Sequence, residues 1–84
     1  MKIPRDFSGD ELARLLEKFG YQITRQTGSH LRLSRTGETE HHITIPRHKH
    51  LKIGTLNSIL IDLAAAWHLS KGELIARLWE KEGG

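Results

Sequence analysis

The 84-residue sequence contains no cysteine and few aromatic residues, which make up 6% of the chain. Without cysteine there are no disulfides, thiolate zinc sites or cysteine nucleophiles, and we expect a reducing compartment, the cytoplasm. No apolar run approaches the roughly 18 residues that span a bilayer, and residues 1–6 lack the apolar segment of a signal peptide. We therefore expect no membrane contact and no export. The short length and an apolar content of 37% predict one domain with a thin core and no deep pocket.

The net charge of +3 is modest, but it is distributed unevenly along the chain. Residues 22–54 contain six basic and two acidic residues, a net charge of +4, together with five of the six histidines. Residues 1–21 are balanced, and residues 55–84 carry a net charge of −1. The concentration of positive charge in the middle of the chain indicates a polyanionic partner.

Residues 8–20 carry the local signals of a helix. Ser8 and Glu11 have the spacing of a capping box, in which each side chain hydrogen-bonds the backbone N–H of the other residue. Gly20 suits the left-handed position that often follows a helix. Between them lies an apolar stripe that predicts a helix over about 9–19: Leu12, Leu15, Leu16 and Phe19.

From Tyr21 onward the apolar residues recur with a period of two, which predicts three short antiparallel strands. Loops at 26–28, with Gly28 at positive φ, and at 36–40 set the register. The predicted cross-strand pairs are Tyr21 with Leu33, Ile23 with Leu31, Leu33 with Ile43 and Leu31 with Ile45. The apolar side chains then share one face, and the other face is polar and open to solvent or ligand: Gln22, Thr24, His30, Arg32, Ser34, His42 and Thr44.

Pro46 cannot donate to a sheet ladder and is expected to end the third strand. A basic loop over 47–54 follows. Thr55 is then expected to cap a second helix, with an apolar stripe that runs from Leu56 to Trp67. This helix suits a position beside the first helix on the apolar face of the sheet.

A short third helix is predicted over 70–79, because Ser70 and Glu73 repeat the capping-box spacing. The predicted fold class is therefore α+β. A single domain (residues 1–84) contains an αβββα core over 1–66, with a three-stranded antiparallel sheet and two helices on one face, and a C-terminal helical extension over 67–84.

Gly28, Ser29 and His30 form the most pointed motif, because a glycine turn leads directly to a histidine at the start of a strand. Histidine is the side chain whose ordinary pKa allows both acid and base catalysis near neutral pH. By itself the motif is a weak signal, since a single exposed histidine is usually a polar surface residue.

Five segments together carry a family resemblance over about residues 3–63: Ile3-Pro4-Arg5-Asp6-Phe7-Ser8-Gly9, Phe19-Gly20-Tyr21, Arg25-Gln26-Thr27-Gly28-Ser29-His30, His41-His42-Ile43-Thr44-Ile45-Pro46-Arg47-His48 and Leu51-Lys52-Ile53-Gly54-Thr55-Leu56-Asn57-Ser58-Ile59-Leu60. In order and content they resemble the HicA family, also called YcfA-like, of toxin–antitoxin RNases. The resemblance implies a fold similar to the double-stranded-RNA-binding domain. It also implies an mRNA interferase that acts without the ribosome and a HicB antitoxin that masks the active site. The family's catalytic histidine, in its Gly-Ser/Thr-His motif, falls on His30.

The resemblance suggests a reaction in which neutral His30 takes the proton of an RNA 2′-OH, and the 2′-oxygen attacks the adjacent phosphorus. A 2′,3′-cyclic phosphate and a 5′-OH result. Arg32 is the first candidate to stabilise the transition-state charge and Arg25 the second, although both are about as well explained as solvated arginines. This route requires no metal and no cofactor, and it cannot cut DNA.

Further residues are predicted to bind single-stranded RNA. The basic loop precedes a helix N-terminus, where backbone amides favour a phosphate, although a loop that only maintains solubility is about as good an explanation. His48 is a candidate general acid, because the loop is expected to return toward His30, with a phosphate or structural contact as the alternative. The predicted RNA-binding set is Arg25, Ser29, Arg32, Arg47, His48, Lys49 and Lys52.

Other roles for the histidines and tryptophans are less well supported. His42 pairs with a residue roughly 13 Å along the strand from His30, too far for a catalytic dyad. A metal site is discounted, because neighbouring strand residues point to opposite faces and cysteine is absent. Trp67 and Trp79 have apolar-stripe spacing, so a core or partner contact is favoured over base stacking.

The sequence is compatible with three functions: an RNA endonuclease toxin, a non-catalytic RNA-binding domain of the same fold, and an inactive structural partner of a HicB-like protein. The helix at 70–79 either extends the core, forms a homodimer contact or receives the antitoxin. Only the endonuclease needs His30 at the start of a strand, so the sequence favours the first function.

Overall fold

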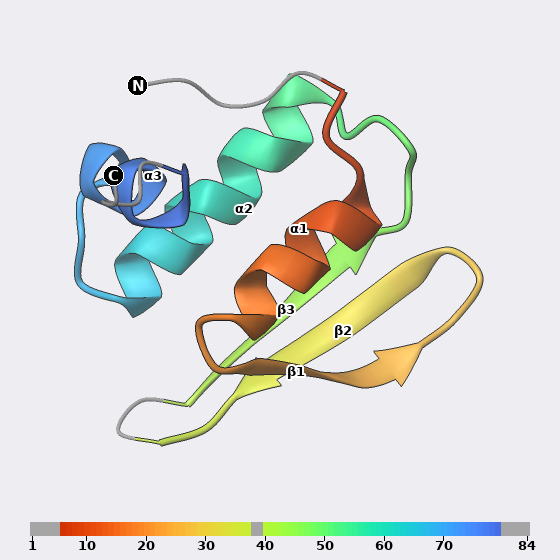
Figure 1. Cartoon of the computed structure of the whole chain (residues 1–84), viewed down its shortest axis with the longest axis horizontal. Helices are drawn as coiled ribbons and strands as arrows, with labels where there is room; N and C mark the ends of the chain where they lie inside the picture. Colours follow the sequence, from red (N-terminus) through yellow and green to blue (C-terminus); the bar gives the residue numbers. More distant parts are fainter. Residues whose placement is uncertain (1–5, 38–39, 80–84) are drawn as a thin grey trace. The chain divides into compact units, whose positions relative to one another are not determined.

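The computed structural model describes residues 6–37 and 40–79 (Figure 1). One helix precedes an antiparallel sheet with the strand order β1-β2-β3, and two helices follow it. The described elements are α1 (Gly9–Glu17), β1 (Tyr21–Gln26), β2 (His30–Arg35), β3 (His41–Pro46), α2 (Ile53–Ala66) and α3 (Lys71–Trp79). The α+β class and the αβββα order with an added C-terminal helix are confirmed.

The chain forms two compact units. The first comprises residues 6–51, with α1 and the sheet. The described part of the second comprises residues 52–79, with α2 and α3. The position of the second helix on the sheet stays a prediction, and residues 1–5 and 80–84 of the predicted domain lie outside the described residues.

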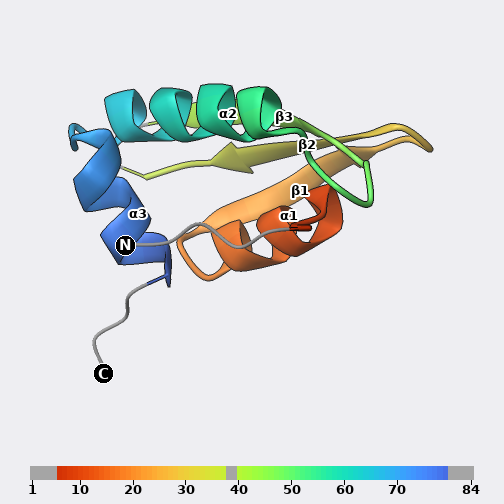
Figure 2. The ribbon, with the colours of Figure 1, turned by 90° about the horizontal axis from the view of Figure 1, so that it is seen from above.

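Helix α1 begins at the predicted capping box and packs on the sheet. Ser8 Oγ accepts a hydrogen bond from Glu11 N at 3.0 Å, and Glu11 Oε1 accepts one from Ser8 N at 2.9 Å. Leu12 and Leu16 are fully buried, and α1 contacts all three strands (Figures 1 and 2). After the helix, Gly20 adopts a φ of +97°, as predicted. Helix α1 therefore covers one face of the sheet and leaves the other to the polar residues.

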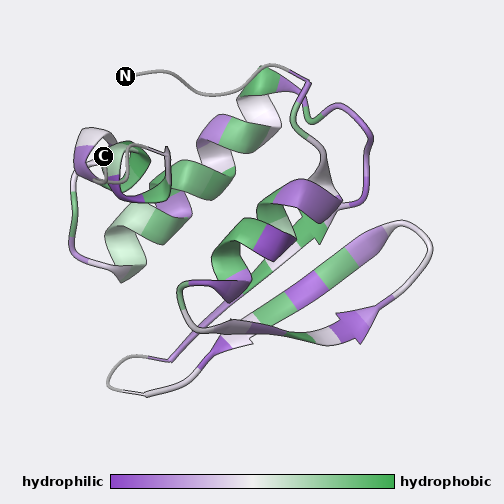
Figure 3. Cartoon of the chain, in the orientation of Figure 1, coloured by the Kyte–Doolittle hydropathy of each residue, from purple (hydrophilic) through white to green (hydrophobic). Residues whose placement is uncertain are grey.

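The second hairpin has the predicted register. Leu33 lies opposite Ile43, and Leu31 lies opposite Ile45. All four side chains are buried, and hydrophobic and hydrophilic residues alternate along β2 (Figure 3). Positions 38–39 of the predicted loop lie outside the described residues. The alternating pattern therefore does separate an apolar face from a polar face.

The first hairpin has a different register from the one predicted. Tyr21 lies opposite Arg35, and Ile23 lies opposite Leu33, so both predicted pairs are wrong. The register shifts at a β-bulge after Ile23, where β1 contains one more residue, Thr24, than the facing part of β2. An alternating pattern carries no sign of such an extra residue, which explains the error.

The turn of this hairpin is also shorter than predicted. Thr27 N donates to His30 O at 2.9 Å, so only Gly28 and Ser29 lie between the paired residues. The Thr27 hydroxyl accepts hydrogen bonds from His30 N at 3.0 Å and Ser29 N at 3.3 Å. This side-chain bonding holds the turn without a positive φ at Gly28, and the prediction for that glycine is wrong.

In the second unit, α2 starts earlier than predicted. Lys52 takes the N-cap position without a side-chain hydrogen bond, and Leu56 N already donates to Lys52 O at 2.9 Å. Thr55 therefore lies inside the helix and does not cap it. Helix α3 has its predicted capping box, since Ser70 N donates to Glu73 Oε1 at 2.8 Å and Glu73 N donates to Ser70 Oγ at 3.1 Å.

Helices α2 and α3 contact each other, and Lys71 Nζ donates a hydrogen bond to Asn57 Oδ1. Trp67 and Trp79, which were predicted to be core or partner contacts, are half-buried. Within the described ranges, no helix has both the length and the apolar character that a membrane span requires. The buried residues of this unit are Leu56, Ile59, Leu60, Leu63, Ala64, Leu74, Ile75 and Leu78.

Candidate functional site

His30 is the first residue of β2, and its side chain is exposed. Ser29 Oγ lies 2.9 Å from His30 Nδ1. When Nδ1 carries the proton, it donates to this hydroxyl, and Nε2 is the unprotonated nitrogen. Over residues 6–37 and 40–79, Nε2 has no hydrogen-bond partner. The ring is thus oriented at one nitrogen and free to accept a proton at the other.

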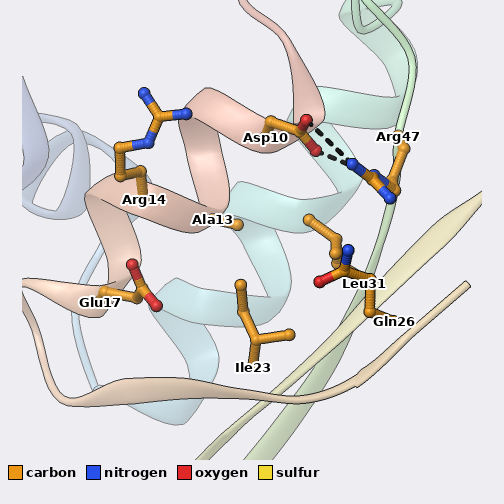
Figure 4. Close-up of a pocket in the computed structure, with 8 residues that line it drawn as sticks. All are labelled: Asp10, Ala13, Arg14, Glu17, Ile23, Gln26, Leu31 and Arg47. Carbon is orange, nitrogen blue, oxygen red and sulfur yellow. Dashed lines mark hydrogen bonds and ion pairs between the residues drawn. The ribbon is translucent and has the colours of Figure 1, made fainter.

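Arg47 holds the turn that carries His30. Its backbone N donates to Ser29 O at 2.8 Å, and its Nη1 donates to Thr27 O at 3.1 Å. The remainder of the guanidinium binds Asp10, with 3.1 Å from Nε to Oδ1 and 3.3 Å from Nη2 to Oδ2 (Figure 4). Arg47, predicted to bind RNA, therefore connects α1 to the turn.

The Asp10 carboxylate is stabilised in its charged form. The hydrogen bonds from Arg47 lower the pKa of Asp10 from its ordinary value, desolvation opposes them, and the charges of Arg47 and Arg14 lower the pKa further. Asp10 and Arg47 are therefore an ion pair at neutral pH. They border an open pocket of about 180 Å³ between α1 and β1, which is lined by Asp10, Ala13, Arg14, Glu17, Ile23, Gln26, Leu31 and Arg47 (Figure 4).

The β-bulge brings Arg25 to the open face of the sheet. Arg25 lies opposite Arg32, so both side chains point to the face that also carries His30. Gln26 lies beside Ile23 in the pocket next to α1, whereas regular alternation after Ile23 would have put Arg25 there (Figure 4). Both arginines are exposed, and neither guanidinium has a polar partner in the described part of the chain. The open face therefore carries two cations near His30 that none of the described acidic residues neutralises.

The other predicted RNA-binding residues follow β3. The side chains of His48 and Lys49 are exposed, and His48 O accepts a hydrogen bond from Gly9 N at 3.0 Å. Because the backbone of Arg47 bonds the turn, the loop does return toward His30, while an acid role for His48 stays a prediction. Lys52 is exposed and belongs to the second compact unit.

A second polar chain crosses the open face at the other end of the strands. Glu40 Oε2 lies 2.8 Å from His42 Nε2, and His42 Nδ1 lies 2.7 Å from Ser34 Oγ, which lies 3.3 Å from Thr24 Oγ1. Both ring nitrogens of His42 thus have a hydrogen-bond partner, whereas only Nδ1 of His30 has one among the described residues. Across the described residues, no three histidine or acidic side chains are grouped in a way that could hold a metal ion.

A comparison with known families decides where the chain belongs. The model of the family described as HicA toxin of bacterial toxin-antitoxin matches residues 9–64, two thirds of the sequence. The chain belongs to the HicA toxin family. The match runs from the start of α1 into α2, and it includes the turn at 27–30. No curated protein and no solved structure gave a significant match to this HicA toxin.

Some residues of the candidate site were not predicted from the sequence. Asp10 was not among the predicted site residues, and Arg47, its partner, is 37 positions away. Thr27 was predicted only as a residue of the loop at 26–28, and Arg25 was a predicted site residue that was not among those assigned to the open face. A single sequence contains no local signal for the pair of Asp10 and Arg47. The β-bulge that puts Arg25 on the open face interrupts the period of two, which is the only pattern that could have assigned its face.

Proposed function

We propose that this HicA toxin is an RNA endonuclease that cleaves single-stranded mRNA, with His30 as general base and without a metal ion. The observation that carries the proposal is the arrangement at the start of β2. Ser29 holds one nitrogen of His30, and Arg25 and Arg32 share the same face. In the part of the chain that the structure describes, the other nitrogen and both guanidinium groups have no polar partner. Membership of a toxin family from toxin–antitoxin systems supports the same function.

In the proposed reaction, Nε2 of neutral His30 accepts the proton of a ribose 2′-OH while the 2′-oxygen attacks the adjacent phosphorus. The bond from phosphorus to the 5′-oxygen breaks, and that oxygen takes a proton from solvent or from a second side chain such as His48. The products are a 2′,3′-cyclic phosphate and a 5′-OH. Ser29 orients the imidazole, and Arg32 with Arg25 donates to phosphate oxygens whose charge grows in the transition state.

The toxin–antitoxin context also indicates how the activity is controlled. We expect a HicB-type antitoxin to cover the open face, because a partner seated on His30, Arg25 and Arg32 would exclude the RNA backbone. Both processes are expected in the cytoplasm, where mRNA is available. A contact of α3 with the antitoxin or with a second copy of the chain stays a prediction.

The proposal is tested with purified protein and an end-labelled single-stranded RNA in excess EDTA, followed by analysis of the fragment ends. His30→Ala is compared with His50→Ala, a matched control, because His50 is also an exposed histidine of the same unit. We expect the wild type and His50→Ala to leave 2′,3′-cyclic phosphate ends. His30→Ala should be slower by at least about 10²-fold, the usual contribution of a general base.

Two results would contradict the proposal in different ways. If the wild type and His30→Ala bind the RNA equally and neither cuts it, the protein is a non-catalytic RNA-binding domain. If cleavage stops in EDTA and returns with a divalent cation, the metal-free mechanism is wrong even though the protein is a nuclease.

A further inference from the structure

Arg47 differs from the other arginines of the candidate site because its guanidinium is already occupied. Nε, Nη1 and Nη2 each donate a hydrogen bond within the protein, two of them to Asp10 and one to Thr27 O. The side chain is 28% exposed, whereas Arg25 and Arg32 are exposed and have no polar partner for their guanidinium groups in the described part of the chain. A phosphate that approached Arg47 would also meet the Asp10 carboxylate, which repels it.

The two ends of this ion pair are fixed to different parts of the unit. On one side, Asp10 lies in the first turn of α1, and the preceding residue, Gly9, donates its N–H to His48 O at 3.0 Å. A Cβ built on Gly9 would lie 2.0 Å from Pro46 O, so this end of the helix is pressed against the end of β3. The contacts at the start of α1 therefore hold Asp10 in place relative to the end of β3.

On the other side, Arg47 reaches the turn by two separate bonds. Its backbone N donates to Ser29 O at 2.8 Å, and its Nη1 donates to Thr27 O at 3.1 Å. Thr27 and Ser29 are the residues whose hydroxyls bond the backbone and the imidazole of His30. A shift of Arg47 would therefore move the groups that orient His30.

We propose that Asp10 and Arg47 act as a clamp that positions the turn at 27–30, and that Arg47 serves the reaction through this turn without contacting RNA phosphate. The inference rests on the proposed endonuclease function and adds two positioning residues to it. Orientation errors of about 1 Å at a reacting group cost up to about 10²-fold in rate, so the clamp should affect kcat more than RNA affinity.

The test compares Asp10→Asn, Arg47→Gln and Arg47→Lys with the wild type. Arg14→Gln is the matched control, because Arg14 lines the same pocket and, within the described residues, makes no hydrogen bond. Arg32→Gln represents a phosphate ligand. For each variant, kcat and KM are measured, together with the slope of log affinity against log salt concentration and the thermal unfolding midpoint as a check of folding.

The clamp predicts that Asp10→Asn and Arg47→Gln each lower kcat by about tenfold to a hundredfold with little change in KM. Arg47→Lys should not restore the rate, because an ammonium group cannot reproduce the bidentate contact with Asp10. The salt slope should stay unchanged in Arg47→Gln and become shallower by about 0.7 in Arg32→Gln. Arg14→Gln should keep the wild-type kcat.

The opposite results identify Arg47 as a phosphate ligand and overturn the proposal. In that case Arg47→Gln would make the salt slope shallower by about 0.7, Arg47→Lys would restore activity, and Asp10→Asn would tighten RNA binding by removing a negative charge.

A failure of the endonuclease proposal is distinguishable from a failure of the clamp. If the wild type cuts no RNA, amide hydrogen exchange at Ser29 and His30 becomes the readout, because both N–H groups bond the Thr27 hydroxyl. Faster exchange at these two amides in Asp10→Asn and Arg47→Gln, but not in Arg14→Gln, supports the clamp. Equal exchange in all variants overturns it.

Discussion

Two arginines face each other on neighbouring strands, an arrangement that opposes folding. Arg25 lies opposite Arg32. Like charges in directly opposed positions destabilise a sheet, and no acidic side chain in the described residues compensates them. Such a pair is expected where a site must bind a negatively charged ligand. The two arginines should therefore lower the stability of the fold and raise its affinity for RNA.

Arg25→Gln should therefore stabilise the fold and weaken RNA binding. We expect the free energy of unfolding to rise by about 0.3 kcal/mol, the size of an exposed cross-strand pair, and the affinity for RNA to fall severalfold. Urea denaturation and fluorescence anisotropy with a labelled RNA measure the two effects. Arg14→Gln is a suitable control, because it also removes an arginine but leaves the pair of Arg25 and Arg32 intact. If Arg25→Gln lowered the free energy of unfolding as much as Arg14→Gln, the unfavourable pairing would be contradicted.

The ion pair of Asp10 with Arg47 should make stability depend on pH in a defined direction. The hydrogen bonds from Arg47 lower the folded-state pKa of Asp10 from its ordinary value of 3.8. A depressed carboxyl pKa stabilises the fold at pH values above the unfolded-state pKa, and this contribution is lost as the pH falls through the folded-state pKa.

The wild type should consequently be more stable than Asp10→Asn at neutral pH, and the difference should shrink below about pH 4. It should vanish once the pH is below the folded-state pKa of Asp10. Urea denaturation of both proteins between about pH 2.5 and 7 measures the difference. A gap that persists undiminished at the acidic end would show that the Asp10 side chain stabilises the protein by packing instead of charge.

At the scale of elements, the start of α1 depends on a close approach that only glycine allows. A Cβ on Gly9 would lie 2.0 Å from Pro46 O and 3.2 Å from Ile45 Cγ2. Gly72, near the start of α3, has Ser70 Oγ at 4.0 Å as its nearest neighbour, so it has room for a side chain. The two glycines have similar helix positions and different surroundings, which makes them a matched pair.

We predict that Gly9→Ala destabilises the protein by about 1–3 kcal/mol, the cost of inserting a methyl group into a packed contact. Gly72→Ala should leave stability unchanged or raise it by up to about 1 kcal/mol, because alanine favours a helix more than glycine does. Urea denaturation of the two variants measures both values. Equal stability of Gly9→Ala and the wild type would mean that α1 does not press against the end of β3.

The elements that the sequence predicted correctly are those whose signals are local. Both capping boxes have partners three residues apart, and the second hairpin follows an uninterrupted period of two. The extra residue Thr24 breaks that period, so the predicted pairs of Tyr21 with Leu33 and of Ile23 with Leu31 were wrong. Thr55 has good capping chemistry, yet the helix begins earlier, at Ile53, and the N-cap position falls on Lys52, whose backbone is extended. The contact of Asp10 with Arg47 depends on the packing of α1, which no local pattern encodes.

In the unit of residues 6–51, the two faces of the sheet differ in charge, and the net charge does not reveal this difference. Helix α1, which carries Asp10, Glu11 and Glu17, covers one face of the sheet. The opposite face carries Arg25 and Arg32. The acidic residues of α1 are therefore separated from Arg25 and Arg32 by the thickness of the sheet, and a modest net charge is compatible with electrostatic binding of a polyanion to the open face.

This arrangement predicts how strongly RNA binding depends on salt. Three cationic side chains of the predicted RNA-binding set lie in this unit and have no acidic partner in the described residues: Arg25, Arg32 and Lys49. Each phosphate contact with single-stranded RNA contributes a slope of about −0.7 to log affinity against log salt concentration, so three contacts predict a slope of about −2. Anisotropy with His30→Ala, which binds without cutting, measures this value, and Arg25→Gln combined with Arg32→Gln should reduce it by about two thirds. A slope shallower than about −1 would mean that a single phosphate is held, and that the open face binds RNA through something other than these cations.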